Sequence, residues 1–489
     1  MLPLAAPAGA DDWPQLQHDA GRTGYTDATV PFDRTRKGGP PVFESAWDWE
    51  KPAEISPLVQ PVVAAGIAYV GDYDGVVHAI SMETGKTLWT CQTGGLIYHT
   101  AAVHQGLVFV GCQDGALYAI DAANGQIRWK HQTGRGIVTA PAALGDAVFT
   151  ASKDGRLYAL NAATGRLLWQ YPAAGQPPLA PILCSPAAGG GVVSFADESL
   201  TAFAIDIATG QLKWRAPLRG QSMMYFWPVL GEKTGVVVYR TQPIQSFHAI
   251  LGRYDSLLAR RAGISRNEHN KLREDRERSR TWAADHRELI RQEQDYLRQV
   301  IGENPWDQTC FVLDLNTGKE KYIPPVPYTG GGGYTPAPPV LDDANQRGWM
   351  IFRSAYSITD GGYMVRGYTD IGTWDPATGY IRQIDQPKQG WETFHLIGDE
   401  TILLSANKDL LLLSTWPNNG AIGIDGHDSY NVTADRKLGG HDRDHLWAAN
   451  VGSAAGNGGG HGEATIVTAA GRIVWNSARY IRAMKPRQQ

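Results

Sequence analysis

The sequence predicts an all-β fold, an eight-bladed β-propeller of four-stranded blades, and three observations support this prediction. One phrase, a polar turn ending in Gly with a Trp four residues later, recurs four times. Its tryptophans are 40, 40 and 45 residues apart, which is the period of a propeller blade. Weaker copies continue toward the C-terminus, so the repeat covers almost the whole chain. The four tryptophans are Trp89, Trp129, Trp169 and Trp214.

The first copy shows why each unit forms a blade. Four short runs rich in β-branched and aromatic residues follow one another, at residues 57–64, 67–72, 76–81 and 86–91. Glycines stand at the turns between them, where a tight turn requires a positive φ. The large, flat Trp of the last run is expected to fill the gap between neighbouring blades. Each repeat is therefore expected to form four antiparallel strands.

Later copies are weaker but keep the register. Tyr322 and Gln383 stand where Trp is expected in the fifth and sixth copies, and residues 401–412 give two further runs. The last copy, residues 464–486, supplies only three strands. Its fourth strand is expected to come from residues 43–49, which have no hairpin partner of their own. This pairing would close the ring by joining the two ends of the chain in one blade.

Composition narrows the class of function. The chain has 489 residues, is 43% hydrophobic and carries a formal net charge of −4. Because no basic stripe accompanies the strands, nucleic acid is not an expected partner. No apolar segment approaches the length needed to span a membrane. The four cysteines, expected to be core thiols because they lack metal-binding spacing, are Cys91, Cys112, Cys184 and Cys310.

The chain is expected to divide into three parts. Residues 1–10 are similar to the tail of a secretory signal, with Ala8-Gly9-Ala10 as a cleavage site, and they predict a secreted or periplasmic location. The alternative is an unstructured Ala-rich N-terminus. Residues 11–42 are expected to form an N-terminal extension, and residues 43–486 the propeller.

The repeats resemble those of the PQQ-like propeller superfamily, which includes quinoprotein dehydrogenases and the outer-membrane assembly factor BamB. The resemblance is carried by the Asp-x-x-Thr-Gly-x-x-x-Trp phrases and by Asp12-Trp13-Pro14-Gln15 followed by His18-Asp19-Ala20-Gly21-Arg22-Thr23-Gly24. It implies the propeller scaffold over the chain except its insertions. The chain has no vicinal cysteine pair of quinoprotein dehydrogenases, no Cys-x-x-Cys-His of their haem-bearing relatives, and no lipoprotein cysteine near Ala10. Bound PQQ is therefore not expected.

The register sorts the long insertions between two faces. The D-to-next-A links and B-to-C turns of a blade open on one face, here named the upper face, and the A-to-B and C-to-D turns open on the lower face. Residues 241–306 in blade five, residues 357–369 in blade six and the link of residues 439–462 are all expected on the upper face. Residues 417–437 are expected to be a C-to-D insertion in blade seven.

The blade-five insertion is expected to be helical. Residues 266–299 are dense in Glu, Arg, Gln and Asp and contain neither Pro nor Gly. One interpretation is a solvated helix, or helical hairpin, with charge pairs four residues apart. The other is a lid over the upper face or an arm that docks a protein partner.

The D-to-A links are expected to bring functional side chains to the mouth of the central channel. Tyr and Trp suit stacking on sugar rings, His, Tyr and Glu can transfer protons, and Arg can hold a carboxylate or sulfate. From register alone, these side chains are expected to converge in one funnel on the upper face. The candidates for proton transfer are His99, Tyr225, His395, His461 and Glu463. The candidates for ligand binding are Tyr98, Arg135, Trp227, Tyr334 and Trp391.

A divalent metal site is also considered in the link between blades seven and eight. Two histidines and two carboxylates fall within five residues there, with His461 or Glu463 available to complete the shell. The alternative is a polar loop whose Asp residues cap turns. The four candidate ligands are His441, Asp442, Asp444 and His445.

Three functions remain open. The first is a non-catalytic exported propeller that binds a carbohydrate, another small ligand or a protein partner. The second is a carbohydrate-active enzyme: a lyase would use Arg135 at the uronate and His99 or Tyr225 as base, and a hydrolase would use Glu392 and Glu463. The third is a quinoprotein oxidoreductase, which the cysteine pattern disfavours. The first is preferred because repeats of this kind carry no chemistry by themselves.

Overall fold

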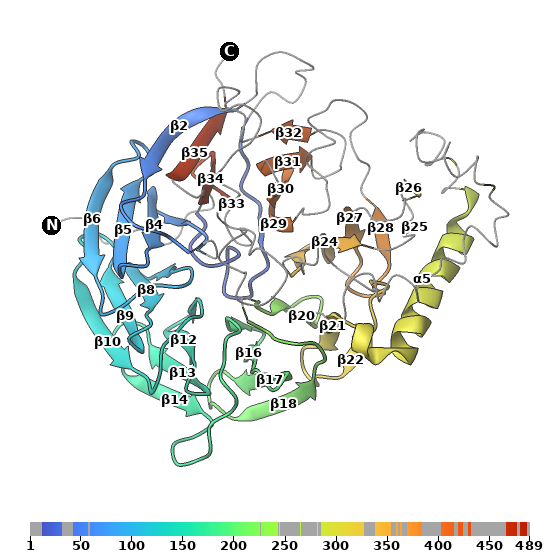
Figure 1. The fold of residues 1–489 in the computed structure, drawn as a ribbon, viewed down its shortest axis with the longest axis horizontal. Helices are drawn as coiled ribbons and strands as arrows, with labels where there is room; N and C mark the ends of the chain where they lie inside the picture. The colour runs from blue at the N-terminus through green and yellow to red at the C-terminus, as the bar shows by residue number, and fades with distance from the viewer. Residues whose placement is uncertain are drawn as a thin grey trace.

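The structure is a computed structural model and describes most of the repeat region. The described residues are 12–31, 43–56, 59–224, 226–242, 244, 265, 281, 285–326, 338–353, 358–359, 362–363, 369–383, 402–414, 419–423, 429–431, 466–476 and 480–486. They form eight sheets arranged around a common axis, with their innermost strands toward the centre (Figure 1). The predicted all-β, eight-bladed propeller is confirmed. Among the described residues, no helix is both long and apolar enough to cross a membrane.

Blades one to four are regular, and each is a meander of four antiparallel strands. Blade one has β3 (Val62–Ala64), β4 (Ile67–Gly71), β5 (Val76–Ser81) and β6 (Thr87–Gln92). Blade two has β7 (Ala102–His104), β8 (Leu107–Gly111), β9 (Ala116–Asp121) and β10 (Ile127–Gln132). Blade three has β11 (Ala142–Leu144), β12 (Ala147–Ser152), β13 (Arg156–Asn161) and β14 (Leu167–Tyr171). Blade four has β15 (Ala187–Gly189), β16 (Val192–Ala196), β17 (Thr201–Asp206) and β18 (Leu212–Pro217).

Blades five to seven keep the same order around longer connections. Blade five has β19 (Val229–Gly231), β20 (Val236–Arg240), β21 (Cys310–Asp314) and β22 (Glu320–Tyr322). Blade six has β23 (Val340–Asp342), β24 (Arg347–Arg353), β27 (Thr369–Trp374) and β28 (Ile381–Gln383), with a small hairpin of β25 (Ile358–Thr359) and β26 (Gly362–Tyr363) between β24 and β27. Blade seven has β29 (Ile402–Asn407), β30 (Leu410–Ser414), β31 (Asn419–Gly423) and β32 (Ser429–Asn431), with β1 (Tyr25–Thr26) added parallel to β29.

Blade eight closes the ring with strands from both ends of the chain. It has β33 (Ile466–Ala469), β34 (Arg472–Asn476), β35 (Tyr480–Pro486) and the outer strand β2 (Phe43–Glu50). β2 pairs antiparallel with β35, and a register shift lies between Ser45 and Trp47. The predicted closure by residues 43–49 is confirmed.

One sequence expectation for blade seven is wrong. Residues 417–437 were expected to form an insertion, yet β31 and β32 lie within this range and are the third and fourth strands of the blade. The range contains no Trp phrase, so its strands carry no repeat signature. The B-to-C insertions of blades five and six, by contrast, lie between β20 and β21 and between β24 and β27, as the register predicts.

The described end of the blade-five insertion packs against the ring instead of standing in solvent. Helix α5 (Arg287–Glu303) is followed by the 3-10 turn η1 (Pro305–Asp307). Leu297, Val300 and Ile301 are buried in a small cluster against Ile323. The side-chain amide of Gln294 pairs with the backbone of Ile381 in β28, donating to its oxygen at 2.8 Å and accepting from its nitrogen at 3.0 Å. The expectation of a fully solvated helix is therefore wrong for α5, which covers the outer edge of blade six (Figure 1).

Candidate functional site

Hydrogen bonds confirm which loops share the upper face on blades two to four. In each blade the B-to-C turn donates a backbone N–H to the link that leads into the same blade. Gln113 donates to Leu96, Lys153 to Gly136 and Glu198 to Pro181, at 3.0, 3.1 and 3.0 Å. On these three blades the upper face is therefore built of paired loops, one link and one turn per blade, joined through their backbones.

Two tyrosines form a stacked pair on the upper face of blade one. Tyr98 lies in the link from blade one to blade two, and Tyr73 lies in the B-to-C turn of blade one. Their ring centroids are 5.8 Å apart at an interplanar angle of 29°. Both side chains are half-buried, and burial raises the pKa of Tyr73. The pair offers a flat apolar surface with polar edges, which suits a planar or sugar-ring ligand.

Two cationic side chains belong to the upper-face loops of blade three: Arg135 lies in the link from blade two and Lys153 in the B-to-C turn. The side chain of Arg135 is exposed, and that of Lys153 is half-buried. The backbone around Arg135 is tightly held, because its carbonyl oxygen accepts hydrogen bonds from Thr133 Oγ1 at 2.7 Å and Ser152 Oγ at 2.9 Å. Asp154 accepts the N–H of Gly134 at 2.7 Å and so fixes the preceding residue. The exposed side chain of Arg135 therefore projects from a link whose backbone is held by hydrogen bonds.

A carboxylate that the sequence analysis did not single out lies on blade four. Glu198 accepts hydrogen bonds from Ser222 Oγ at 2.6 Å and from the Met223 N–H at 3.1 Å. Burial raises the pKa of Glu198, and these two hydrogen bonds oppose the rise. Glu198 is equivalent to Tyr73 and Lys153 in blades one and three, because each lies two residues before the positive-φ residue of its B-to-C turn. Comparing that one position between repeats would have identified all three residues from the sequence.

Two predicted site residues lie in the wall of the ring and not on its surface. His99 is 4% exposed; burial, and then the charge of Arg22, lower its pKa to about 3, so the imidazole is neutral at pH 7. Its Nδ1 accepts the N–H of Thr100 at 2.8 Å. Trp227 is 1% exposed and belongs to the largest core cluster, so its ring is not available for stacking. Register predicted the links correctly but not the direction in which these side chains point.

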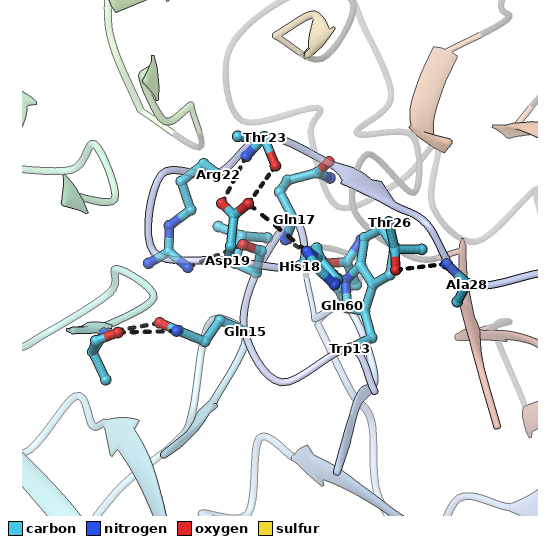
Figure 2. Close-up of polar contacts among 12 residues, drawn as sticks. Trp13, Gln15, Gln17, His18, Asp19, Arg22, Thr23, Thr26, Ala28 and Gln60 are labelled. Atoms are coloured by element: carbon cyan, nitrogen blue, oxygen red, sulfur yellow. Dashed lines mark hydrogen bonds and ion pairs between the residues drawn. The ribbon is translucent and has the colours of Figure 1, made fainter. Parts of the chain in front are cut away.

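Residues 12–26 occupy the middle of the ring, where they lie against the innermost strands (Figures 1 and 2). Arg22 is fully buried among carbonyl oxygens: Nε donates to Pro186 at 3.1 Å, Nη1 to Leu16 at 3.0 Å and Nη2 to Pro141 at 2.7 Å. Burial lowers the pKa of Arg22 to about 9, so the guanidinium remains charged at neutral pH. At the start of the segment, Asp12 Oδ1 accepts the N–H of Ala65, in the A-to-B turn of blade one.

The segment also carries a small polar network (Figure 2). Asp19 accepts hydrogen bonds from the N–H of Thr23 at 3.0 Å and from its hydroxyl. His18 Nδ1 lies 3.8 Å from Asp19 Oδ2. Burial raises the pKa of Asp19, but His18 and Thr23 together outweigh this effect and leave the pKa below its ordinary value. The sequence predicted only an N-terminal extension here and contributed these residues to the family resemblance, without indicating that they lie inside the ring.

Most of the other candidates lie outside the described residues. These are Tyr225, Tyr334, Trp391, His395, His461 and Glu463, together with the predicted metal ligands His441, Asp442, Asp444 and His445. Within the described ranges, no group of three His, Cys, Asp or Glu side chains could hold a metal ion. Of the predicted funnel, the described part therefore places Tyr98 and Arg135 on the upper face.

The closed ring of eight mostly four-stranded blades, with Asp-x-x-Thr-Gly-x-x-x-Trp phrases at the outer strands, defines the class of PQQ-repeat β-propellers. The family model described as outer membrane protein assembly factor BamB matches residues 73–319, about half of the chain. The chain belongs to this family of BamB-like PQQ-repeat propellers. No curated protein sequence matches it significantly.

Solved structures share the fold at low sequence identity. Quinohemoprotein alcohol dehydrogenase from Comamonas testosteroni is similar with a TM-score of 0.56 and 13% identity, over 98% of this chain and 81% of that chain. A europium-containing methanol dehydrogenase has a TM-score of 0.54 and 13% identity, over 86% and 85% of the two chains. BamB from Moraxella catarrhalis has a TM-score of 0.49 and 12% identity, over 91% and 100%. Identities this low show the fold alone.

The residues of this chain do not fit a bound quinone as the resemblance to quinoprotein dehydrogenases would require. Its four cysteines are separate, buried and unpaired thiols on blades one, two, four and five, so they supply no vicinal pair. This agrees with the expectation that they are core residues.

Proposed function

We propose that the protein binds an anionic ligand with a flat ring, such as an acidic glycan, on the upper face of blades one to three. The observation that carries this proposal is the stacked pair of Tyr73 and Tyr98 on the upper face, together with the exposed Arg135 in the next D-to-A link. An aromatic platform contributes contact area to a sugar ring. An Arg guanidinium can hold a carboxylate or sulfate through two parallel hydrogen bonds.

The position of the pair supports binding on the surface and not passage through the ring. Residues 12–26 run along the innermost strands of blades one to seven and so occupy the middle of the ring. The long B-to-C insertions of blades five and six belong to the same face. Loops that grow on one face of a rigid ring are a common source of binding sites.

Binding is favoured over catalysis by the state of His99. As the base of a lyase it would have to reach substrate, but its imidazole is 4% exposed and lies behind the link. His99 is therefore a buried residue of the ring and not a surface group. A protein partner docked through the blade-five insertion is the competing proposal, and the experiment below distinguishes the two.

The test measures the melting temperature and binding heat of the full chain with matched oligosaccharides that carry uronate, sulfate or no charge. Acidic oligosaccharides are expected to raise the melting temperature, and neutral ones of equal length are not. Arg135→Gln and Tyr98→Ala should each weaken binding about tenfold or more, as central Arg and Tyr contacts do in other interfaces. The matched control is Arg166→Gln, because Arg166 is an exposed arginine beside the C-to-D turn of blade three.

Two results would contradict the proposal. One is equal binding of neutral and acidic oligosaccharides, and the other is unchanged affinity in Arg135→Gln. If no oligosaccharide binds, but a protein captured by the full chain is lost on changes in the blade-five insertion, the protein-partner proposal is supported instead.

A further inference from the structure

The segment of residues 12–26 makes one contact of the same kind with blade after blade. In blades one to six the contacted residue is the middle residue of the three-residue innermost strand, and in blade seven it is in β29. The contact is a hydrogen bond to the backbone N–H of that residue, 2.7 to 2.9 Å long. The contacted residues are Val63, Val103, Ala143, Ala188, Leu230, Leu341 and Ala406.

The acceptors follow the order of the blades. The carbonyl oxygens of Trp13 and Pro14 serve blades one and two, and those of Ala20, Gly21, Thr23 and Gly24 serve blades four to seven. Blade three is served by a side chain: Gln15 Oε1 accepts from Ala143 N–H at 2.8 Å, and Gln15 Nε2 donates to its oxygen at 3.0 Å (Figure 2). A side-chain amide has the same donor and acceptor as a peptide group, so Gln15 completes the series.

These contacts satisfy groups that a propeller otherwise leaves open. The innermost strand of each blade is an edge strand, whose N–H and C=O groups face the axis and can pair with another chain. Addition of an extended peptide to such an edge is a recurrent mode of peptide recognition. Here one peptide meets seven edges in turn.

The backbone of the segment adopts conformations that the residue types alone do not favour. Gln17, His18 and Arg22 all have positive φ, at 55°, 75° and 61°. Non-glycine residues adopt this conformation rarely, and it persists where the surroundings determine it. Gly24 has φ +69° and packs so closely on the Gln17 side chain that an added Cβ would overlap it.

We infer that residues 12–26 are an internal peptide ligand and that the inner edges of blades one to seven are its receptor. The same part of the chain continues into β2, which is the outer strand of blade eight. Residues 12–26 and β2 together therefore contact all eight blades, the first at the inner strands and the second at the outer edge of blade eight.

The experiment separates the peptide from the ring after folding. A protease site is inserted within residues 32–42 of the full chain, the folded protein is cut, and the pieces are analysed by gel filtration. The N-terminal piece is expected to co-elute with the ring. A labelled synthetic peptide of residues 12–30 should then exchange into the cut protein.

Substitutions in the peptide test whether its binding to the ring depends on these particular contacts. Gln15→Ala removes both hydrogen bonds to Ala143. Gly24→Ala places a methyl group against the Gln17 side chain, at a position whose backbone is left-handed. Each should speed dissociation at least about tenfold. Thr29→Ala is the matched control, because Thr29 is exposed. Its exchange rate should equal that of the unaltered peptide.

The inference is overturned if the cut N-terminal piece separates at once while the ring keeps its melting temperature. It is also overturned if the altered peptides exchange at the rate of the control. Hydrogen exchange of the uncut protein provides a second measurement should the inserted site impair folding. The amides of Ala188, Leu230 and Leu341 must be protected, and rapid exchange at all three would contradict the inference.

Discussion

Trp89 of blade one lies against Gly125 of blade two, and its Nε1 donates to the Ala122 oxygen at 3.0 Å. A Cβ added to Gly125 would fall 2.7 Å from Cε3 of the indole. Trp47 of the closing strand makes the same contact across the seam, with its Nε1 2.8 Å from the Met82 oxygen and its ring on Gly85. The repeat phrase thus encodes the joint between blades: its Gly receives the Trp of the blade before.

Gly125→Ala is expected to destabilise the ring by more than its backbone conformation alone explains. Any non-glycine residue at φ +74° costs about 1–2 kcal/mol, and the methyl group must also displace Trp89. The control is Gly66→Ala, because Gly66 has φ +75° and no neighbour within 4 Å of an added Cβ. Urea unfolding measures both variants. Equal losses of unfolding free energy would show that the Trp89 contact adds nothing.

Trp47→Ala is expected to destabilise the protein by about 3–5 kcal/mol, because it removes a large buried side chain and the hydrogen bond to Met82. Leu88→Ala should change stability by less than about 0.5 kcal/mol, since Leu88 is 53% exposed.

Deletion of residues 1–52 should cause a cooperative loss of stability, because it removes β2 as well as residues 12–26. A truncated protein that melts like the full chain would contradict closure at both places.

Because His99 is buried as a neutral imidazole, the free energy of unfolding should fall in acid. The pKa of His99 is about 3 in the folded chain and about 6.5 when unfolded, so the unfolded state binds the proton more tightly. Stability is therefore fully present above about pH 6.5 and falls as the pH drops toward 3, by about 1.4 kcal/mol for each pH unit. His99→Gln should flatten this part of the pH profile of urea unfolding. Parallel profiles for wild type and His99→Gln would show that the residue does not titrate in this way.

Gln294→Ala is expected to loosen helix α5 from blade six. The change leaves the N–H and C=O of Ile381 without their side-chain partner, at a cost of about 1–3 kcal/mol. Gln299→Ala is the control, because Gln299 is exposed on the same helix. Hydrogen exchange of β28 and the melting temperature report the effect. Replacement of residues 245–302 by a short linker should likewise destabilise the ring, because it removes most of α5 with its buried residues.

The repeat phrase explains which parts of the fold the sequence predicts well. Spacing of Trp89 and its equivalents predicted blades one to four, and an unpaired N-terminal strand predicted the closure. β31 and β32 were missed because they carry no phrase, so only pairing with β30 defines them. Register also placed His99 in its link, but it does not specify on which side of the backbone a side chain lies. The path of residues 12–26 depends on single backbone hydrogen bonds, which leave no pattern in the sequence.

The bond between Asp12 and the A-to-B turn at Ala65 sets the direction in which the chain enters the ring. That turn is on the lower face, opposite the tyrosine pair and Arg135. Whatever is joined to the chain just before Asp12, whether a fusion partner, a dye or a solid support, therefore starts from the lower side. Immobilisation through this end would present the upper face outward and leave it open to ligand, whereas an attachment at the loops of the upper face would cover it.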